Sequence, residues 1–269
     1  MHLMSYLIVG AVAFAVAMLT FFSGFGLGSL LLPAFSFFFP LEIAVAATAV
    51  VHLANNLFKF VLMGRYTHWK TAALFGVPAV CASFLGAQAL ILLANFEPLH
   101  HYMFLEKECV ITPIGLVIGI LIICFSAFDL RPLSEPANIP SKFIPAGGLL
   151  SGFFGGLSGH QGAFRAAFLI KAGLRRDAFI ATGVVCAIAV DIVRLSVYGT
   201  HRLGAVWHST PAKEGEPAIG MLVAVAAGCA FAGSYGGSRL ISKVTLGFVQ
   251  KVVGVMLLVL GTAIATGWV

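Results

Sequence analysis

The stretch SGFFGGLSGHQGAFR, Ser151–Arg165, decides how this chain folds. It contains five glycines, and its polar residues Ser158 and His160 lie between two apolar segments, 143–157 and 161–170. Glycine adopts backbone conformations that other residues avoid, so a run of this kind predicts a break between two helices.

The composition around this break is that of a membrane protein. Hydrophobic residues make up 60% of the chain, charged residues only 10%, and the mean hydropathy is +1.02. A soluble domain carries about 25% charged residues, so this chain cannot cover itself with a water-compatible surface. Six apolar runs come close to or exceed the roughly 20 residues that a helix needs to cross a bilayer; they are 43–63, 71–94, 110–128, 178–198, 217–236 and 245–266. We therefore predict an all-α polytopic membrane protein.

A second glycine-rich break lies near the N-terminus, in SGFGLGSLLLP at Ser23–Pro33. It separates the apolar run 4–22 from the run 26–39. The first of these runs is not preceded by a basic region and leads into more apolar sequence. We therefore interpret it as part of the structure and not as a cleaved signal peptide.

The two breaks begin two copies of one unit. The triplet SGF occurs at Ser23–Phe25 and again at Ser151–Phe153. Further matches follow in the same order; they pair Gly28 with Gly162, Ala44 with Ala178, Ala47 with Ala181, Thr48 with Thr182, and LGAQAL (Leu85–Leu90) with YGGSRL (Tyr235–Leu240). This common order predicts an internal duplication, with a first repeat over 1–128, a linker over 129–142 and a second repeat over 143–269.

Loop charge favours folding each broken region as a re-entrant hairpin of two short helices. Hairpins put nine Lys and Arg on one side, in loops 64–70, 129–142, 171–177 and 237–244. The three on the other side are Lys107, Arg202 and Lys213. Single spans would instead divide the basic residues about evenly, although the run 4–22 is long enough to span. The positive-inside rule then predicts a cytoplasmic linker, both termini outside, and two inverted repeats of a hairpin plus three spans.

Broken helices in matching positions of two repeats are typical of transporters, whose substrate site lies near the breaks. Helices restarting near Gly28 and Gly162 present unpaired backbone N–H groups and positive dipole ends, which favour an anion. The alternative is that the glycines serve only close helix packing, as in GxxxG faces.

A family resemblance is carried by the same residues. SGFGLGSLLLP followed by AAT (Ala46–Thr48), and the second break followed by IATG (Ile180–Gly183), resemble the repeats of the TauE/SafE membrane transporters. The resemblance implies transport of sulfite, organosulfonates or related sulfur anions, commonly as export. The chain departs from the family pattern where His160 and Gln161 interrupt the glycine run, and where Ala167 stands opposite Pro33.

Polar residues inside the apolar runs are the remaining candidates, because such residues are costly in a membrane and mark function. We expect the substrate to be bound by Gly26, Gly28, Ser29, Asn55, Asn56, Lys59, Ser158, Gly159, His160, Gln161, Gly162, Arg165 and Arg194. His52 and Asp191 are candidates for carrying a coupling proton. In the simpler alternative, Lys59 and Arg194 reach out to the interface, or Asp191 forms only a structural pair with Arg194.

An intramembrane protease is an alternative from a different class. Gly156–Gly159 reads G-x-S-G, which resembles rhomboid serine proteases, and His52 with Asn56 matches their upstream H-x-x-x-N pattern. Hydrolysis needs a general base. The rhomboid resemblance places it on a later transmembrane helix, and no histidine follows His208. A passive anion channel is a third possibility, distinguished from a carrier by its turnover and lack of saturation.

We therefore expect a non-enzymatic carrier that exports a small sulfur-containing anion, such as sulfite or an organosulfonate, by alternating access across a bacterial inner membrane. Its partners are this substrate and the lipid bilayer. The net charge of +6 is spread over short loops, so we expect no nucleic-acid partner. The five cysteines lack metal-ligand spacing, so we expect no metal and no other cofactor. A homodimer is compatible with the sequence, but no motif supports one.

Overall fold

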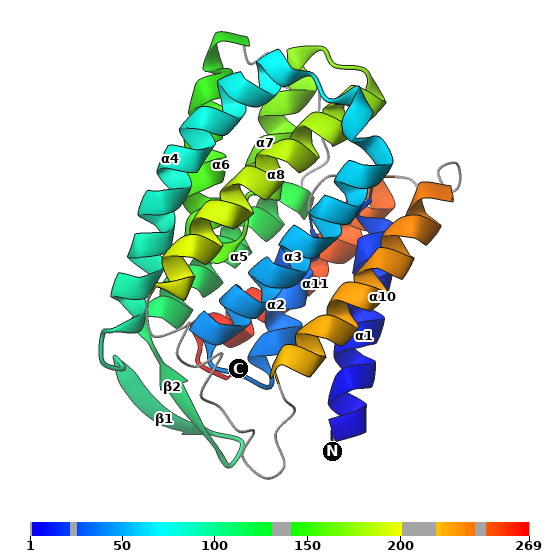
Figure 1. Ribbon diagram of the computed structural model, residues 1–269. Helices are drawn as coiled ribbons and strands as arrows, with labels where there is room; N and C mark the ends of the chain where they lie inside the picture. Colours follow the sequence, from blue (N-terminus) through cyan, green and yellow to red (C-terminus); the bar gives the residue numbers. More distant parts are fainter. Residues whose placement is uncertain (1, 22–25, 131–140, 201–218, 240–245, 269) are drawn as a thin grey trace.

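The computed structural model describes residues 2–21, 26–130, 141–200, 219–239 and 246–268. Within these ranges the chain is mostly helical (Figure 1). The ten α-helices are α1 (His2–Leu19), α2 (Leu27–Ser36), α3 (Leu41–Met63), α4 (Trp69–Ala94), α5 (Pro113–Leu130), α6 (Ile144–Ser158), α7 (Gly162–Leu169), α8 (Arg176–Gly199), α10 (Ile219–Arg239) and α11 (Leu246–Ala265). Short 3-10 turns cover Gly64–Tyr66, Ser141–Phe143 and Ile170–Ala172. Each apolar run of the sequence corresponds to one helix, and each glycine break separates two.

Four segments in the described part of the chain are long and apolar enough to cross a membrane: Leu41–Tyr66, Trp69–Ala94, Arg176–Gly199 and Ile219–Arg239. The repeated triplet at Ser23–Phe25 lies outside the described residues. So do most of the linker expected over 129–142 and most of the loop at 199–216.

The two predicted breaks occur at glycines that need their conformational freedom. Gly26 has φ 109° and Gly159 has φ 82°, in the left-handed region that favours glycine. The two breaks also meet, because a Cβ atom on Gly28 would lie only 3.3 Å from the carbonyl oxygen of Gly159. The start of α2 therefore touches the end of α6 near the middle of the protein.

Each broken pair of helices reverses direction at its glycine. In Figure 1, α1 rises from the N-terminus at the bottom, and α3 also begins at the bottom, so α2 must return there. The pair α6 and α7 begins and ends at the top of the same view. The two hairpins therefore enter the helix bundle from opposite ends, while both chain termini lie at one end.

Glycines allow one helix of each hairpin to pack very closely on a partner from the other half. Gly148, Gly152 and Gly156, four residues apart on α6, face the carbonyl oxygens of Phe75, Ala79 and Ser83 on α4. Gly233 and Gly237 on α10 face the carbonyl oxygens of Phe14 and Met18 on α1 in the same manner. In both pairs the residue numbers rise together, so the helices are parallel. Small residues give this backbone proximity, which the sequence offered as an alternative role for glycine.

Alanine at Gly152 is expected to destabilise the protein by about 1–3 kcal/mol, the usual cost of overpacking. Its Cβ atom would overlap the Ala79 carbonyl oxygen, which belongs to helix backbone and cannot move aside. Gly228→Ala on α10 is the matched control, since nothing lies within 4 Å of a Cβ atom there. Thermal unfolding in detergent should show a lower midpoint for Gly152→Ala only. Equal midpoints for the two variants would contradict the close α4–α6 packing.

One element departs from the all-α prediction. His100–Phe104 (β1) and Lys107–Ile111 (β2) form an antiparallel hairpin. Leu105 and Glu106 form its turn with φ 50° and 63°, without the Asn-Gly or Asp-Gly signal from which such turns are predicted. The Tyr102 hydroxyl donates to the Thr266 carbonyl at 2.7 Å, and Lys107 Nζ donates to the Trp268 carbonyl at 2.6 Å. These bonds attach the hairpin to the end of α11.

Candidate anion-binding site

One face of α3 carries four polar side chains in the interior of the bundle. His52, Asn55, Asn56 and Lys59 recur at helical spacing, so they project toward one side of the helix. All four are buried, and Lys59 is only 5% exposed. Lys59 therefore does not reach the interface, which excludes the simpler reading of that residue for this conformation.

Asp191 on α8 connects this face to the second half of the chain. Its Oδ2 atom lies 2.6 Å from His52 Nδ1, and its Oδ1 atom accepts hydrogen bonds of 3.0 Å from both Gln161 Nε2 and Arg194 Nε. Arg194 Nη2 is 2.7 Å from the same oxygen, which confirms the predicted ion pair. Both carboxylate oxygens are thus engaged by side chains from α3, the second break and α8.

Arg194 is held inside the protein by further contacts. Its side chain is fully buried, and its Nη1 atom lies 3.3 Å from the Gly155 carbonyl oxygen. Tyr198, one turn further along α8, donates from its hydroxyl to the carbonyl of Gly156. This arginine belongs to the packing between α8 and α6, with its charge already balanced by Asp191.

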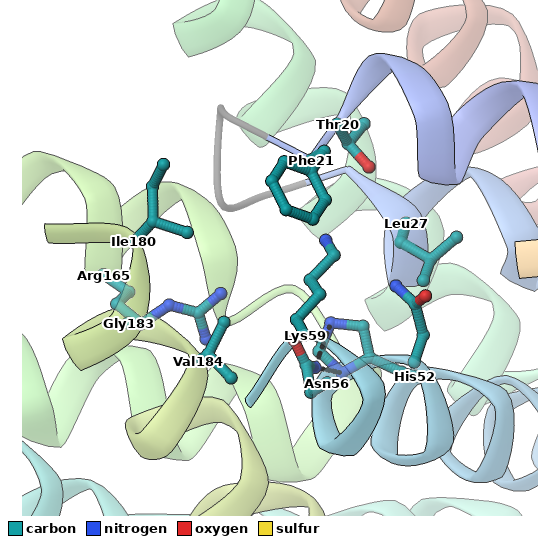
Figure 2. Close-up of a pocket in the computed structure, with 11 residues that line it drawn as sticks. Thr20, Phe21, Leu27, His52, Asn56, Lys59, Arg165, Ile180, Gly183 and Val184 are labelled. Atoms are coloured by element: carbon teal, nitrogen blue, oxygen red, sulfur yellow. Dashed lines mark hydrogen bonds between the residues drawn. The ribbon is translucent and has the colours of Figure 1, made fainter. Parts of the chain in front are cut away.

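A small cavity lies beside the Asp191 cluster (Figure 2). Its lining combines the polar face of α3 with apolar residues from other helices; the lining residues are Thr20, Phe21, Leu27, His52, Asn55, Asn56, Lys59, Arg165, Ile180, Gly183 and Val184. Figure 2 shows the Arg165 guanidinium and the Lys59 side chain approaching the cavity from different helices. The site is therefore assembled from both halves of the chain.

The two cations of the cavity are placed differently. Arg165 donates from Nη1 to Gln161 Oε1 at 3.0 Å and passes the bare backbone of Gly183, where a Cβ atom would lie 3.4 Å from Arg165 Nε. Lys59 has no hydrogen bond or ion pair to any residue that the structure describes. Its ammonium group lies 5.3 Å from the centroid of the Phe21 ring.

The interior of the described structure has an excess of positive charge. Apart from histidines, its buried charged side chains are Lys59, Arg165, Arg194 and Asp191. The one carboxylate is already paired with Arg194. An excess of buried positive charge is costly, so the cavity favours a ligand that supplies negative charge.

A hydrogen-bond donor also faces the cavity without a partner. Ser234 on α10 donates to Asn55 Oδ1 at 2.7 Å and thereby orients the amide group. Asn55 Nδ2 is buried and finds no acceptor among the described residues. An unsatisfied buried donor beside a cavity points to an acceptor atom on a ligand.

The structure places the predicted site residues in two groups. The cavity brings together Asn55, Asn56, Lys59 and Arg165, with His52 beside them, while Gln161, Asp191 and Arg194 form the cluster behind it. The residues of the glycine turns do not line the cavity; they are Gly26, Gly28, Ser29, Ser158, Gly159, His160 and Gly162. The turns contact each other instead of leaving a space between them.

The second turn is engaged in contacts of its own. Ser158 Oγ lies 3.1 Å from the Phe154 carbonyl oxygen, to which it donates. The His160 ring stacks on Phe125 with centroids 5.6 Å apart, and its Nδ1 atom is 3.1 Å from Ser158 Oγ. No group of three or more His, Cys, Asp or Glu within the described ranges is arranged to hold a metal ion.

Several cavity residues were not among the predicted site residues. Ile180, Gly183 and Val184 lie at the start of α8, where the IATG match between the repeats gave a signal that could have indicated them. Thr20, Phe21 and Leu27 flank the first break. Ser234 offered no signal, because only the packing of α10 on α3 brings it to Asn55.

Comparison with known families gives one match. The family model described as Sulfite exporter TauE/SafE matches residues 9–264, which is nearly the whole chain. No curated protein and no solved structure was found to match.

Proposed function

Because the chain belongs to the TauE/SafE family of membrane transporters, we propose that it carries a small sulfur-containing oxyanion, such as sulfite or an organosulfonate, out of a bacterial cell across the inner membrane. The observation that carries this proposal is the buried cavity lined by Lys59 and Arg165. Two buried cations are costly in a mostly apolar bundle, and the one buried carboxylate of the described residues pairs with Arg194. A bound anion supplies the missing charge.

Each polar group of the cavity has a role in this proposal. The Arg165 guanidinium and the Lys59 ammonium neutralise the anion, and the unpaired Asn55 amide donates to one of its oxygens. Asn56 lies beside His52 on the same wall. Gln161 and Arg194 do not line the cavity but position groups that do. Gln161 links Arg165 to the Asp191 carboxylate by hydrogen bonds, and Arg194 pairs with the same carboxylate. In this conformation the side chains, and not the glycine turns, hold the anion.

The apolar part of the cavity lining accounts for the breadth of the proposed substrate class. It is formed by Phe21, Leu27, Ile180 and Val184, and Phe21 lies against the Lys59 ammonium group. Such a surface accepts the carbon chain of an organosulfonate, while the polar wall binds its oxyanion group. An inside-negative potential favours outward movement of anions by about 2.3 kcal/mol for each net charge and 100 mV.

The helix pairing supports alternating access by two inverted repeats. In the proposed duplication, α1 to α5 correspond in order to α6, α7, α8, α10 and α11. Under this correspondence the packed pair α1–α10 is equivalent to the packed pair α6–α4, and the pairs α3–α8 and α5–α11 are each equivalent to themselves. The two hairpins enter from opposite ends, as inverted copies require (Figure 1). We assign 1–128 and 143–269 to the repeats and 129–142 to a cytoplasmic linker, with both termini outside. Rocking of one repeat against the other exposes the cavity alternately to each side.

The protease alternative finds no support in the family, because TauE/SafE transporters are not enzymes. The Ser158 hydroxyl, which the protease reading needs as nucleophile, directs its hydrogen to a backbone carbonyl and lies off the cavity.

Purified protein in liposomes should show saturable flux of sulfite, ethanesulfonate or both. Lys59→Met should lower this flux at least about tenfold, because a hydrogen bond to a charged group contributes roughly 1.5–3 kcal/mol. The same change should leave the thermal midpoint equal or higher, since it removes a buried cation that no described residue pairs. Lys70→Met, at an exposed position at the start of α4, is the control and should match wild type in both measurements.

Two results would count against the proposal. Folded wild-type protein without flux of any sulfur anion excludes the transport of this class. Flux that does not saturate with anion concentration indicates the passive channel instead of the carrier.

A further inference from the structure

The contact between His52 and Asp191 fixes where the histidine carries its hydrogen. Asp191 Oδ2 lies 2.6 Å from His52 Nδ1, and the other carboxylate oxygen accepts from Gln161 and Arg194. A carboxylate with two donors on Oδ1 is ionised and acts as an acceptor at Oδ2, so Nδ1 must carry a hydrogen. The second ring nitrogen, Nε2, is then a lone pair in neutral His52. The Asn56 amide nitrogen, a donor, lies 3.1 Å from Nδ1 and 3.4 Å from Nε2, and with a hydrogen on Nδ1 only Nε2 can accept from it.

His52 belongs to the lining of the cavity that also contains Lys59 and Arg165. In neutral His52 the Nε2 lone pair offers nothing to an oxyanion in this cavity. When Nε2 binds a proton, the same atom becomes a third cationic donor for the anion. We propose that anion binding takes up one proton at His52 Nε2, which makes the protein a proton-coupled anion carrier; this inference rests on the proposed function.

Burial of the ring and the arginines near it oppose a second proton on His52 until the anion arrives. Lys59 lines the same cavity from α3, Arg165 reaches it from α7, and α8 contributes Asp191 and Arg194. Helix α2 contributes Gly28 and no titratable side chain. The negative charge of Asp191 is shared with Arg194, so the cations that line the cavity add to the cost of a further positive charge. A bound anion offsets these two charges and removes that opposition.

The step involves no covalent change in the substrate. A proton from water adds to the Nε2 lone pair as the anion enters, and it leaves again when the anion departs. By linkage, each ligand then strengthens the binding of the other by the same factor. The loaded carrier moves one negative charge fewer than the anion alone, so the membrane potential drives its export less strongly. A proton gradient drives the anion in the direction in which protons flow, so a gradient that is acidic outside opposes export.

Calorimetric titration of the purified protein with ethanesulfonate, in two buffers of different ionisation enthalpy, counts the protons taken up per anion bound. Ethanesulfonate does not buffer near neutrality, so the protons counted are those of the protein. Wild type should take up about one proton, and its affinity should fall about tenfold per pH unit at the upper end of the histidine range, about pH 6 to 8. His52→Gln should bind more weakly and take up none. His101→Gln, on the exposed β1 strand, should retain the uptake.

The possible results distinguish proton coupling at His52 from the proposed transport of a sulfur anion. Binding of ethanesulfonate to wild type without proton uptake, and with an affinity independent of pH, overturns the coupling while leaving the anion carrier intact. Uptake that persists in His52→Gln and disappears in Lys59→Met assigns the proton to the lysine and overturns the role of His52. If wild type binds no sulfur anion, the proposed function fails first. If His52→Gln does not fold, the pH dependence of wild type still decides, as does accumulation of the anion driven by a proton gradient in liposomes.

Discussion

Arg165→Met is expected to reduce anion flux at least about tenfold, and more than Lys59→Met does. Arg165 reaches the cavity from the short helix α7, is only 4% exposed, and is oriented by the 3.0 Å hydrogen bond to Gln161. Its planar guanidinium can bind two oxygens of one oxyanion, whereas an ammonium acts as a point charge. The measurement is initial flux into liposomes, with protein incorporation determined in parallel.

Arg165→Lys distinguishes charge from geometry at the same position. It keeps the positive charge but loses the forked donor, so we expect flux between those of wild type and Arg165→Met. Arg175→Met, at an exposed residue just before α8, is the control for the loss of one positive charge. Wild-type flux from Arg165→Met would show that the anion does not bind in this cavity.

Asp191→Asn is expected to destabilise the protein by about 3–5 kcal/mol, the cost of leaving a buried charge without its partner. The fully buried Arg194 would keep its positive charge and lose its only carboxylate, and His52 and Gln161 would lose the acceptor they share. Thermal or detergent-induced unfolding of the purified protein measures this effect.

Two further variants show whether the unpaired charge of Arg194 causes the loss of stability in Asp191→Asn. Asp177→Asn on the same helix α8 changes an exposed first-turn residue and should cost no more than about 1 kcal/mol. The double variant Asp191→Leu with Arg194→Met removes both charges and should recover much of the stability. If Asp191→Asn is as stable as Asp177→Asn, the ion pair does not contribute to folding as described.

The helices and their breaks could be predicted because local sequence determines them. Apolar runs of membrane-spanning length give the long helices, and left-handed glycines at Gly26 and Gly159 interrupt the two broken regions. The polar face of α3 was likewise visible, since His52, Asn55, Asn56 and Lys59 recur at helical spacing. These features depend on residues within one or two turns of each other.

The arrangement of the site depends on contacts between segments that are distant in the sequence, so it could not be predicted from the sequence. Residues of the glycine turns were expected to bind the anion, yet Gly28 packs against the Gly159 carbonyl and the turn residues do not line the cavity. Nothing in the sequence near Asn55 indicates that Ser234 orients its amide. The β-hairpin was missed because a Leu-Glu turn carries no local signal.

The partner of α1 is α10, so two helices that lie far apart in the sequence pack on each other. During translation α1 must wait in the bilayer while most of the chain is made, and its surface around Phe14 and Met18 has no glycine helix to receive it until then. The pairing of α1 with α10 is therefore a contact of high sequence separation, which forms only after α10 has been made. Separately synthesised halves would each lack a partner for one helix of their own hairpin, so they are expected to fold only when expressed together.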